Sequence, residues 1–487
     1  MKVAFVASEG VPFSKTGGLA DVVGALPKAL AALGHEVEVI LPRYRSTPEG
    51  ASVPHARSLT LALGSGYKFA AVQDGGRAHQ VQTYLIECPE YFDRDGLYQD
   101  KGEDYPDNAH RFAAFSMAAL EFLKHGATSP DIIHCHDWET ALVPIYLRSL
   151  YQEDSYFGKT SVVFTIHNLG YQGLFPPHLL PQISLHASLF TIDALEYYGR
   201  VNLLKGGILF SDFITTVSRK YAEEIQTPEF GCGLEGVLHS RADRLQGIVN
   251  GVDYAEWDPA TDKLLAANYT PTNLKGKEAC KKALLEKMGV QTPVLRRPVI
   301  GIVSRFASQK GFDLIATIAE QLAALDLYVV ALGTGEPPHE ELFRTMAAKY
   351  PEKFLVKIAY DNTLAHQIEA GSDMFLMPSR YEPCGLNQIY SLKYGAVPIV
   401  RATGGLDDTI EAFDGKSGTG FKFQEYSPQA LLATIHAALE AYQTPKIWQH
   451  LRQNGMKKDF SWTTSARAYS QIYQSLQKGK GAATTHI

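Results

Sequence analysis

The sequence predicts an α/β protein made of two consecutive doubly wound, Rossmann-like lobes. Short apolar runs alternate with helical patterns along the chain, which indicates parallel strands covered by helices on both faces. The alternation is interrupted by a Lys-rich stretch and starts again after Pro298. A chain of 487 residues is long enough for two such lobes.

The first lobe opens with a strand, a glycine turn and a helix. Residues 3–7 form an apolar run, and the pair Gly17-Gly18 marks the turn. Apolar residues then recur at helical spacing until Gly34, which ends the predicted helix. Residues 37–41 give the next strand, so a parallel sheet is expected from the start.

Later elements follow the same pattern. In the first lobe, residues 131–135 and 161–166 are predicted strands, with a helix over 141–150 between them. In the second lobe, a helix is expected over 312–325. The predicted strands of the second lobe are residues 299–303, 327–332, 354–358, 373–377 and 397–400.

These elements predict three segments of the chain. Residues 1–246 form the first domain and residues 247–460 the second, since the hinge is placed at the glycines near residue 247. Residues 461–487 are predicted to form a C-terminal helix that packs back on the first domain, followed by a frayed tail.

Composition and charge exclude several classes of protein. Hydrophobic residues make up 45% and charged residues 20%, a balance typical of globular proteins. No apolar run approaches the roughly 18 residues that span a bilayer. The formal net charge of −6 lacks the basic excess of nucleic-acid-binding proteins. We therefore expect neither a membrane nor a nucleic-acid partner.

Cysteine usage indicates the compartment. The five cysteines are an odd number without a C-x-x-C pair, which argues against a disulfide framework and against a cysteine zinc site. The first residues do not have the pattern of a signal peptide. A reducing cytoplasm is therefore the expected location, and no metal or cofactor is predicted.

The first glycine turn is a candidate anion site. In the stretch from Lys15 to Asp21, Gly17 and Gly18 allow backbone N–H groups to approach an anion, and Lys15 adds positive charge. The stretch is neither G-x-G-x-x-G nor a Walker motif, so a dinucleotide or ATPase site gains little support. A plain glycine turn with a surface lysine explains it equally well.

Two cations follow the first strand of the second lobe. Arg305 can form a bidentate contact with a phosphate, and Lys310 can act as a point charge. A solvated surface is the ordinary explanation for such residues. Their position at the carboxyl end of a strand, where ligands collect, favours anion binding.

A later strand ends in a second candidate anion site. Gly385 marks a tight turn before a helix, so the N–H groups of Gly385 and Leu386 are expected to point at an anion. Glu382 would repel a phosphate but suits a sugar hydroxyl. A helix cap with a solvated glutamate is the alternative. The glycine turn Thr403-Gly404-Gly405 repeats this arrangement.

Other polar residues allow weaker interpretations. His167 follows a strand and can be a general base or a structural histidine. His134 and His136 have the spacing of a metal pair, but a third ligand is missing. Asp93 and Asp95 form a D-x-D motif of the kind that binds divalent metal in one class of glycosyltransferases, but three residues match easily by chance.

Together these stretches resemble the bacterial glycogen synthases and plant starch synthases. The resemblance covers roughly residues 1–475, in order and at similar spacing. The motifs that carry it are residues 15–22, 136–138, 165–173, 226–236, 250–253, 304–311, 382–386 and 403–406.

The resemblance implies a fold and an activity. The fold is GT-B, in which two Rossmann-like domains face each other across a cleft that holds the active site. The first domain is the acceptor side and the second binds the nucleotide sugar. The implied reaction transfers glucose from ADP-glucose to the non-reducing-end 4-hydroxyl of an α-1,4-glucan such as glycogen, with retention of configuration.

The resemblance also assigns roles to residues. The catalytic set is Asp137, His167, Arg305, Lys310 and Glu382. Arg305 and Lys310 resemble a diphosphate clamp, Glu382 and His167 resemble groups that hold the glucosyl ring, and Asp137 lines the donor sugar and the acceptor. The substrate-binding set is Lys15, Gly18, Asn250, Tyr360, Cys384, Gly385, Leu386, Thr403, Gly404 and Gly405. Within it, Tyr360 is expected near the adenine base, and Asn250 near the sugar.

Two departures and several alternatives remain. Many related retaining transferases have a second glutamate where this chain has Tyr390. The glycogen synthase branch resembles this chain at that position. Asn387 stands where Thr is frequent in the family. The alternatives are a UDP-glucose-using or sucrose-forming transferase, a phosphorylase, and an inactive glucan-binding regulatory protein.

Overall fold

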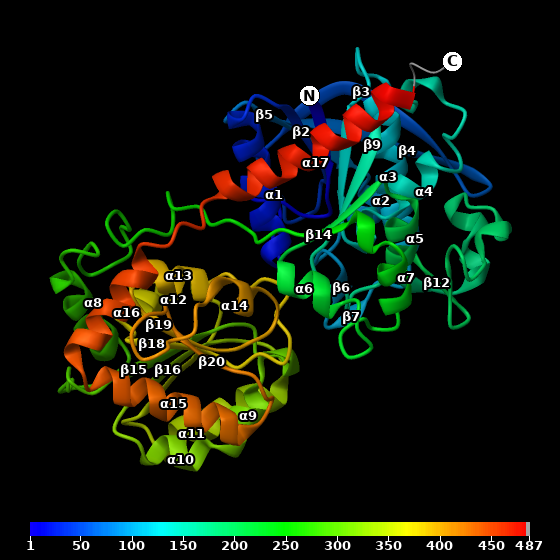
Figure 1. Cartoon of the computed structure of the whole chain (residues 1–487). Coiled ribbons are helices and arrows are strands. Elements are labelled where there is room, and N and C mark those ends of the chain that lie inside the picture. Colours follow the sequence, from blue (N-terminus) through cyan, green and yellow to red (C-terminus); the bar gives the residue numbers. More distant parts are fainter. Residues whose placement is uncertain (484–487) are drawn as a thin grey trace. The chain divides into compact units, whose positions relative to one another are not determined.

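The computed structural model describes residues 1–483, and the chain forms two compact units (Figure 1). Unit 1 consists of Met1–Val217, Ala222–Gly251 and the segment that starts at Trp462. Unit 2 consists of Ser218–Tyr221 and Val252–Ser461. The short piece Ser218–Tyr221 is therefore part of unit 2 although it lies within the sequence of unit 1.

Unit 1 is built on a nine-stranded sheet. Its strand order is β14-β13-β9-β8-β1-β2-β5-β4-β3, and the strands from β14 to β5 are parallel. The parallel strands are β1 (Lys2–Val6), β2 (Glu36–Pro42), β5 (Val81–Glu87), β8 (Ile132–His136), β9 (Ser161–Ile166), β13 (Phe213–Thr216) and β14 (Leu245–Gly247). Most are short buried apolar runs, which explains why the sequence predicts β1, β2, β8 and β9 closely.

An antiparallel extension completes this sheet. β3 (Val53–Leu63) pairs with β4 (Gly66–Ala78), and β4 pairs with β5, both in antiparallel register. Tyr67 and Phe69 on β4 are 70% and 71% exposed, so apolar residues lie on both faces of this strand. The sequence therefore lacks the clean alternation that marks a half-buried strand here.

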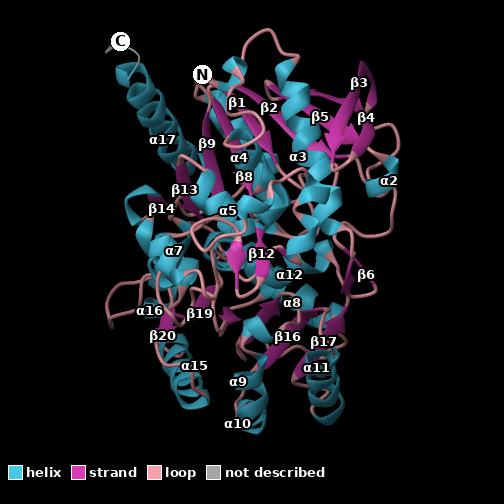
Figure 2. Cartoon of the chain, turned by 90° about the vertical axis from the view of Figure 1, so that its right-hand side faces the viewer, coloured by secondary structure: helices cyan, strands magenta, loops and turns pink. Residues whose placement is uncertain are grey.

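Helices and small sheets complete unit 1 (Figure 2). The helices are α1 (Gly18–Ala32), α2 (Pro89–Phe92), α3 (Asn108–Lys124), α4 (Leu142–Leu147), α5 (Leu203–Phe210), α6 (Arg219–Glu224, shared with unit 2), α7 (Glu235–Ser240) and α17 (Trp462–Ala483). The two small sheets contain β6 (Gln99–Asp100) and β7 (Glu103–Asp104), and β10 (Leu174–Phe175), β11 (Glu196–Tyr197) and β12 (Arg200–Asn202).

The C-terminal helix α17 belongs to the core of unit 1. It lies beside α1, as the red and blue helices in Figure 1 show. Its residues Ala466, Tyr469 and Tyr473 are buried together with residues of β1 and α1. The hydroxyl of Tyr473 is 2.7 Å from Nδ1 of His134 on β8, so the helix is tied to the sheet by a buried hydrogen bond.

Replacing Tyr473 with alanine is expected to destabilise unit 1 by about 3–5 kcal/mol, because the change removes a fully buried aromatic ring. The variant Tyr473→Phe keeps the ring and loses only the bond to His134, so about 1 kcal/mol is expected. Chemical unfolding of both variants measures the difference. An alanine variant as stable as the starting protein would show that α17 contributes little to unit 1.

Unit 2 is a second doubly wound domain. Its six-stranded parallel sheet has the order β17-β16-β15-β18-β19-β20. The strands are β15 (Val299–Val303), β16 (Tyr328–Gly333), β17 (Phe354–Ile358), β18 (Met374–Met377), β19 (Val397–Arg401) and β20 (Phe421–Phe423). The first five lie within a residue or two of their predicted positions, because four of them are short, mostly buried apolar runs and β17 differs only by its exposed Lys357.

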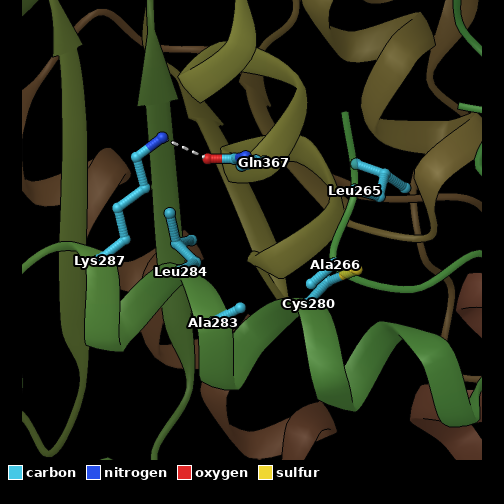
Figure 3. Close-up of a pocket in the computed structure, with 7 residues that line it drawn as sticks. All are labelled: Leu265, Ala266, Cys280, Ala283, Leu284, Lys287 and Gln367. Carbon is cyan, nitrogen blue, oxygen red and sulfur yellow. Dashed lines mark hydrogen bonds between the residues drawn. The ribbon is translucent and has the colours of Figure 1, made fainter. Parts of the chain in front are cut away.

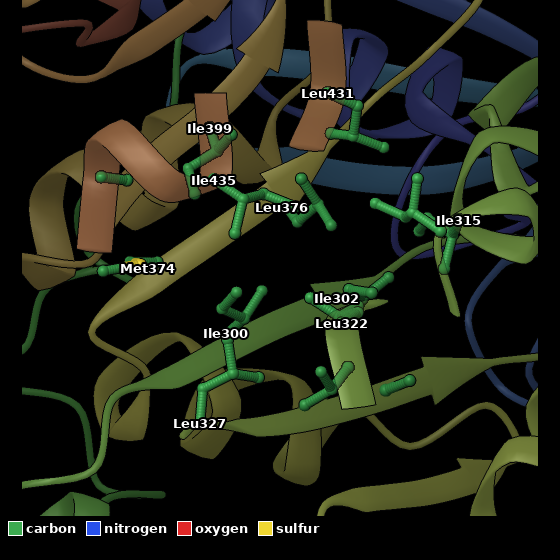
Figure 4. Close-up of a cluster of buried hydrophobic side chains, with 14 of the residues drawn as sticks. Ile300, Ile302, Ile315, Leu322, Leu327, Met374, Leu376, Ile399, Leu431 and Ile435 are labelled. Atoms are coloured by element: carbon green, nitrogen blue, oxygen red, sulfur yellow. The ribbon is translucent and has the colours of Figure 1, made fainter. Parts of the chain in front are cut away.

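Helices flank this sheet. They are α8 (Lys275–Lys287), α9 (Phe312–Thr317), α10 (Ala319–Ala324), α11 (Pro337–Lys349), α12 (Asn362–Gly371), α13 (Asn387–Tyr394), α14 (Gly404–Thr409), α15 (Pro428–Tyr442) and α16 (Pro445–Met456). The single helix predicted over 312–325 is interrupted at Ile318, whose φ of −99° and ψ of 9° are not helical. Side chains of β15, β18, β19 and α15, including Ile300, Leu376 and Ile435, form one hydrophobic core (Figure 4).

The end of the chain differs in part from the prediction. α17 continues to Ala483, so residues 478–483 of the expected frayed tail are helical. Residues 484–487, on which the rest of that prediction falls, lie outside the described residues. Among residues 1–483, none of the helices is both long enough and apolar enough to cross a bilayer.

Candidate active site

The strand order in the sheet of unit 2 reverses between β15 and β18. From β15 the strand order continues to β16 and β17, and from β18 it continues to β19 and β20. In doubly wound folds, ligands bind at the carboxyl ends of the strands at this point. The predicted phosphate-binding residues of unit 2 follow these two strands, so the topology brings them together.

The loop after β15 carries the two predicted cations. Arg305 is exposed, and its guanidinium has no ion-pair partner among the described residues. Lys310 ends a short 3-10 turn, and Gly311 follows with φ of +75°. A Cβ atom at Gly311 would lie 2.0 Å from the carbonyl oxygen of Pro378, so only glycine lets this loop approach the end of β18 so closely.

Lys310 and Glu382 form a largely buried ion pair, in which Lys310 is the more exposed partner. Nζ of Lys310 lies 2.6 Å from Oε2 of Glu382, and their side chains are 16% and 7% exposed. The hydroxyl of Ser379 donates a second hydrogen bond to the same carboxylate oxygen. The carboxylate of Glu382 thus connects the loops that follow β15 and β18 and holds the ammonium of Lys310 in place.

The turn after β18 leads into α13 with an open N-terminus. Gly385 has φ of +69°, a conformation that favours glycine. No side chain of the described residues caps α13, so its first N–H groups remain available and the helix dipole favours a negative charge there. Cys384 is buried beside them. This arrangement is the one that the sequence predicts for an anion site.

The glycine turn after β19 lies directly against the turn after β18. The N–H of Gly405 donates to the carbonyl of Glu382. A Cβ atom at Gly404 would lie 1.9 Å from the Glu382 oxygen, and one at Gly405 would lie 1.9 Å from the Cys384 oxygen. Both glycines are therefore required by close backbone contact, and they hold residues 382–384 in position.

Two further residues, which the sequence did not indicate, support this site. The hydroxyl of Ser218 donates to the carbonyl of Pro383, and Gln388 donates to the carbonyls of Cys384 and Gly385. Neither residue has a sequence signal. The partner of Ser218 is 165 positions away in sequence, and Gln388 lies within α13 and bonds back to the turn that precedes it. Ser218 belongs to the short segment of unit 2 that lies within the sequence of unit 1.

The two departures from the family pattern have structural roles. Tyr390 stacks on Trp257, with ring centroids 3.8 Å apart, and Trp257 stacks on His366 at 3.7 Å. Position 390 thus holds a ring that packs rather than a carboxylate. The amide of Asn387 donates to the carbonyl of Val303 at the end of β15. Tyr360, predicted near an adenine base, follows β17 and is 81% exposed.

In the sheet of unit 1, the strand order reverses between β1 and β8. The glycine turn with Lys15 and Gly18 follows β1, and Asp137 follows β8. Glu9 accepts hydrogen bonds from the backbone and the hydroxyl of Thr16, and so fixes this turn. Nζ of Lys15 lies 2.6 Å from Asp21, and a Cβ atom at Gly18 would meet no described atom within 4 Å.

Asp137, His167 and Asn250 are the other predicted residues of unit 1. Asp137 has φ of +58° and ψ of −178°, which strains a residue with a side chain. Its Oδ1 accepts from the backbone N–H of His167, and burial raises its pKa to about 7. Burial lowers the pKa of His167 to about 3. Oδ1 of Asn250 is buried and has no hydrogen-bond partner among the described residues.

Glu9 makes the stability of unit 1 depend on pH. Burial raises the pKa of Glu9 from 4.5 to about 7, so the folded chain holds this proton more tightly than the unfolded chain. The stabilisation is complete below about pH 4.5 and is lost as the pH rises through about 7. It amounts to roughly 1–3 kcal/mol.

The variant Glu9→Gln is expected to remove this contribution. Its melting temperature relative to the starting protein should therefore rise between about pH 5 and about pH 8. Glu49→Gln replaces an exposed glutamate of unit 1 and serves as the matched control, for which no comparable change with pH is expected. A constant difference for Glu9→Gln as well would contradict the burial argument.

The structure does not favour the two metal interpretations. Asp93 and Asp95 both bond to Arg45, at 2.8 Å and 3.1 Å, so the D-x-D carboxylates are used in ion pairs. His134 has both ring nitrogens hydrogen-bonded to hydroxyl groups. No group of three or more metal-ligating side chains is found among residues 1–483.

A small cavity lies elsewhere in unit 2 (Figure 3). It has a volume of about 80 Å³ and is lined mainly by apolar side chains of α8, with Lys287 and Gln367 hydrogen-bonded to each other at its edge. Pockets for small-molecule ligands usually have roughly 300–1,000 Å³. This cavity is smaller than that, and none of the predicted site residues lines it.

Comparisons with known proteins identify the family. The model for the starch synthase catalytic domain matches residues 2–240, and the model for glycosyl transferases group 1 matches residues 286–458. A glycogen synthase of Koribacter versatilis is 55% identical and covers 97% of this chain and 98% of that protein. The chain belongs to the glycogen synthase and starch synthase family. A glycogen synthase of Geotalea uraniireducens is 48% identical over 99% of this chain and 100% of that protein.

A solved member of the same family has the same fold. The catalytic domain of starch synthase IV from Arabidopsis thaliana, bound to ADP and acarbose, matches with a TM-score of 0.90 and 34% identity. The match covers 98% of this chain and 99% of that chain. A sucrose-phosphate synthase from Thermosynechococcus elongatus matches with a TM-score of 0.62 at 17% identity, which shows a shared fold only.

Membership in the glycogen synthase and starch synthase family confirms three predictions. The α/β fold with two Rossmann-like domains is GT-B, the family is the one that the motifs indicate, and the chain is a hexosyltransferase of glycogen or starch synthase type. The roles of individual site residues stay predictions. The domain boundaries after residues 246 and 460 also stay predictions. In the structure, the chain passes from unit 1 to unit 2 after Gly251 and returns to unit 1 after Ser461.

Proposed function

We propose that this chain transfers glucose from ADP-glucose to the non-reducing-end 4-hydroxyl of an α-1,4-glucan such as glycogen, with retention of configuration. One observation carries the proposal. Arg305, Lys310 and the open N-terminus of α13 gather at the carboxyl ends of β15 and β18. This is an arrangement for a diphosphate, and the similar starch synthase IV was solved with ADP.

The charges of unit 2 support departure of ADP. Breaking the bond between sugar and phosphate leaves negative charge on the diphosphate and positive charge on the sugar. Arg305, Lys310 and the N–H groups of Gly385 and Leu386 are placed to stabilise the negative charge as it develops. Since the chain supplies these groups, we expect turnover to continue in the presence of EDTA.

Glu382 is proposed to hold the glucosyl ring rather than to attack it. One oxygen of its carboxylate already accepts hydrogen bonds from Lys310 and Ser379, which stabilises the negative charge and reduces its strength as a nucleophile. The departing diphosphate then takes the proton of the acceptor hydroxyl on the same face of the sugar. Detection of a covalent glucosyl–Glu382 species by mass spectrometry would overturn this route.

Unit 1 is proposed to supply contacts to sugar and donor. The unpaired Oδ1 of Asn250 suits a sugar hydroxyl, and His167 and Asp137 lie together at the ends of β9 and β8. Lys15 and the N–H groups at Gly18 suit the donor phosphates. A cytoplasmic location, favoured by the free cysteines, is part of the same proposal.

The release of ADP tests the proposal. The purified protein is incubated with ADP-glucose with and without glycogen, and matched reactions contain UDP-glucose or EDTA. We expect ADP release that requires glycogen, little UDP release, and no loss with EDTA. Preferential use of UDP-glucose would favour the alternative donor. No release from either donor, together with retained glycogen binding, would favour an inactive glucan-binding protein.

A further inference from the structure

Three histidines lie side by side near the site of unit 1. His134 and His136 are two residues apart on β8, so they share one face of the sheet, and His167 follows the neighbouring strand β9. The ring centroids of His134 and His136 are 4.3 Å apart, and those of His136 and His167 are 5.3 Å apart. The structure does not favour a metal site at His134 and His136, so these residues need another explanation.

All three rings are neutral at physiological pH. Burial lowers the pKa of His134 and of His167 to about 3 and lowers that of His136 well below its usual value. A neutral imidazole has one N–H donor and one nitrogen acceptor. The hydrogen-bond partners of each ring therefore decide which nitrogen carries the proton.

His134 is fully satisfied by hydroxyl groups. Its Nδ1 bonds to Tyr473 of α17 and its Nε2 to Thr165, whose hydroxyl also bonds to Thr215. Hydroxyl groups donate or accept, so either tautomer of His134 fits. His134 thus packs against His136 without restricting its proton.

His136 has a single partner. Its Nδ1 lies 3.0 Å from Nε2 of His167, and its own Nε2 is buried without a hydrogen-bond partner among the described residues. The hydroxyl of Thr140 bonds to both the backbone N–H and the carbonyl of His136, so the residue is firmly placed. Between the two rings, one nitrogen must donate and the other must accept.

The unpartnered Nε2 of His136 distinguishes the two possible directions of the hydrogen bond between His136 and His167. If His167 donated, His136 would carry its proton on Nε2, which would leave a buried N–H group without an acceptor. If His136 donates from Nδ1, its Nε2 is a bare acceptor. Orphaned buried N–H groups are rarer in proteins than orphaned acceptors. The second arrangement is therefore favoured, and it places the proton of His167 on Nδ1.

We propose that His136 is a positioning residue that donates its Nδ1–H to Nε2 of His167 and thereby holds His167 in the Nδ1–H tautomer. His167 then offers a hydrogen-bond donor, and it does not act as a general base. Nδ1 of His167 has no partner among the described residues of unit 1, so this donor is available. That the donor meets an oxygen of the glucosyl ring rests on the function proposed above.

The tautomers are measured directly by NMR of protein labelled with ¹⁵N-histidine. In the full-length protein, His136 and His167 are both expected to carry their protons on Nδ1. His167→Asn and His136→Phe identify the two sets of signals by their disappearance. A proton on Nε2 of His167 in the unaltered protein overturns the proposal.

The same variants test the effect of His136 on its neighbour. In His136→Phe, the ring shape remains but the donor is lost, so the proton of His167 should move in part to Nε2. His136→Asn can place an amide N–H near the former Nδ1 and should restore the Nδ1–H tautomer. An unchanged tautomer of His167 in His136→Phe contradicts the proposal.

Kinetics give a second readout. His136→Phe is expected to lower kcat by about 10- to 100-fold, the effect usual for a residue that orients a functional histidine, and His136→Asn should recover most of it. His35→Phe is the matched control, because His35 is also buried in unit 1 with one bonded and one unpartnered ring nitrogen. It should change stability but not kcat. Equal losses of kcat in His35→Phe and His136→Phe would indicate a structural effect only.

The two proposals fail in different ways. If ADP-glucose is not a substrate of the unaltered protein, the proposed function fails while the NMR result for His136 and His167 still stands. If ADP-glucose is used and His167 carries its proton on Nε2, the function stands and the inference about His136 fails.

Discussion

Replacing Gly405 with alanine is expected to lower the rate of glucosyl transfer by at least about 10²-fold, because the added methyl group displaces the turn that we propose binds the diphosphate. The Cβ atom of an alanine would lie 1.9 Å from the carbonyl oxygen of Cys384, well inside van der Waals contact. The backbone of residues 382–386 must then move, and with it Glu382 and the open N-terminus of α13. Initial rates of ADP release from ADP-glucose and glycogen measure the effect.

Gly236→Ala is the matched control for this substitution. Gly236 lies in α7 of unit 1, and an added Cβ atom there would meet no described atom within 4 Å. This variant should keep the rate of the starting protein and gain slightly in stability, since alanine favours a helix. A Gly405→Ala variant with full activity would show that the turn tolerates displacement, and would remove the argument from close backbone contact.

Replacing Lys310 with alanine is expected to lower kcat by about 10²–10³-fold, because the change removes a positive charge that we propose stabilises the departing diphosphate. Binding of glycogen should survive, since Lys310 is proposed to contact the donor and not the acceptor. Lys287→Ala in α8 is the control, because this lysine is exposed and bonds only to Gln367 among the described residues. Unchanged kinetics in Lys310→Ala would contradict the role of the cation.

The ion pair with Glu382 gives this prediction a second measurable part. Removing Lys310 leaves the buried carboxylate of Glu382 with the hydroxyl of Ser379 as its hydrogen-bond donor among the described side chains, which is expected to cost about 3 kcal/mol or more of stability. The double variant Lys310→Ala/Glu382→Gln removes the uncompensated charge. It should regain stability without regaining activity, so the two effects can be separated.

Much of the fold could be predicted because the strands of both units are buried parallel strands. Such strands are continuous apolar runs, as in residues 299–303 and 374–377. The antiparallel strands β3 and β4 have no comparable pattern, since exposed aromatic residues on β4 hide the alternation. Ser218–Tyr221 could not be assigned to unit 2, because its contacts are with residues more than 160 positions away.

The candidate site could be predicted as a set of residues but not as a geometry. Charged residues and glycines after strands indicate an anion site, and the strand order in unit 2 places those loops together. The ion pair of Lys310 with Glu382 joins residues 72 positions apart and leaves no local signal. The same holds for the bond of His136 to His167. The sequence suggested His134 and His136 as a metal pair, whereas in the structure His134 bonds to two hydroxyl groups and His136 bonds to His167.

Unit 1 is built from segments at both ends of the chain, and this has a consequence for synthesis of the chain on the ribosome. Unit 1 needs Trp462, Tyr469 and Tyr473, which are translated after all of unit 2. Unit 2 is complete once Ser461 has left the exit tunnel, so it can fold first. Until the last helix emerges, the α1 face of unit 1 lacks its cover, and this half-finished surface is where a chaperone would be expected to bind the nascent chain.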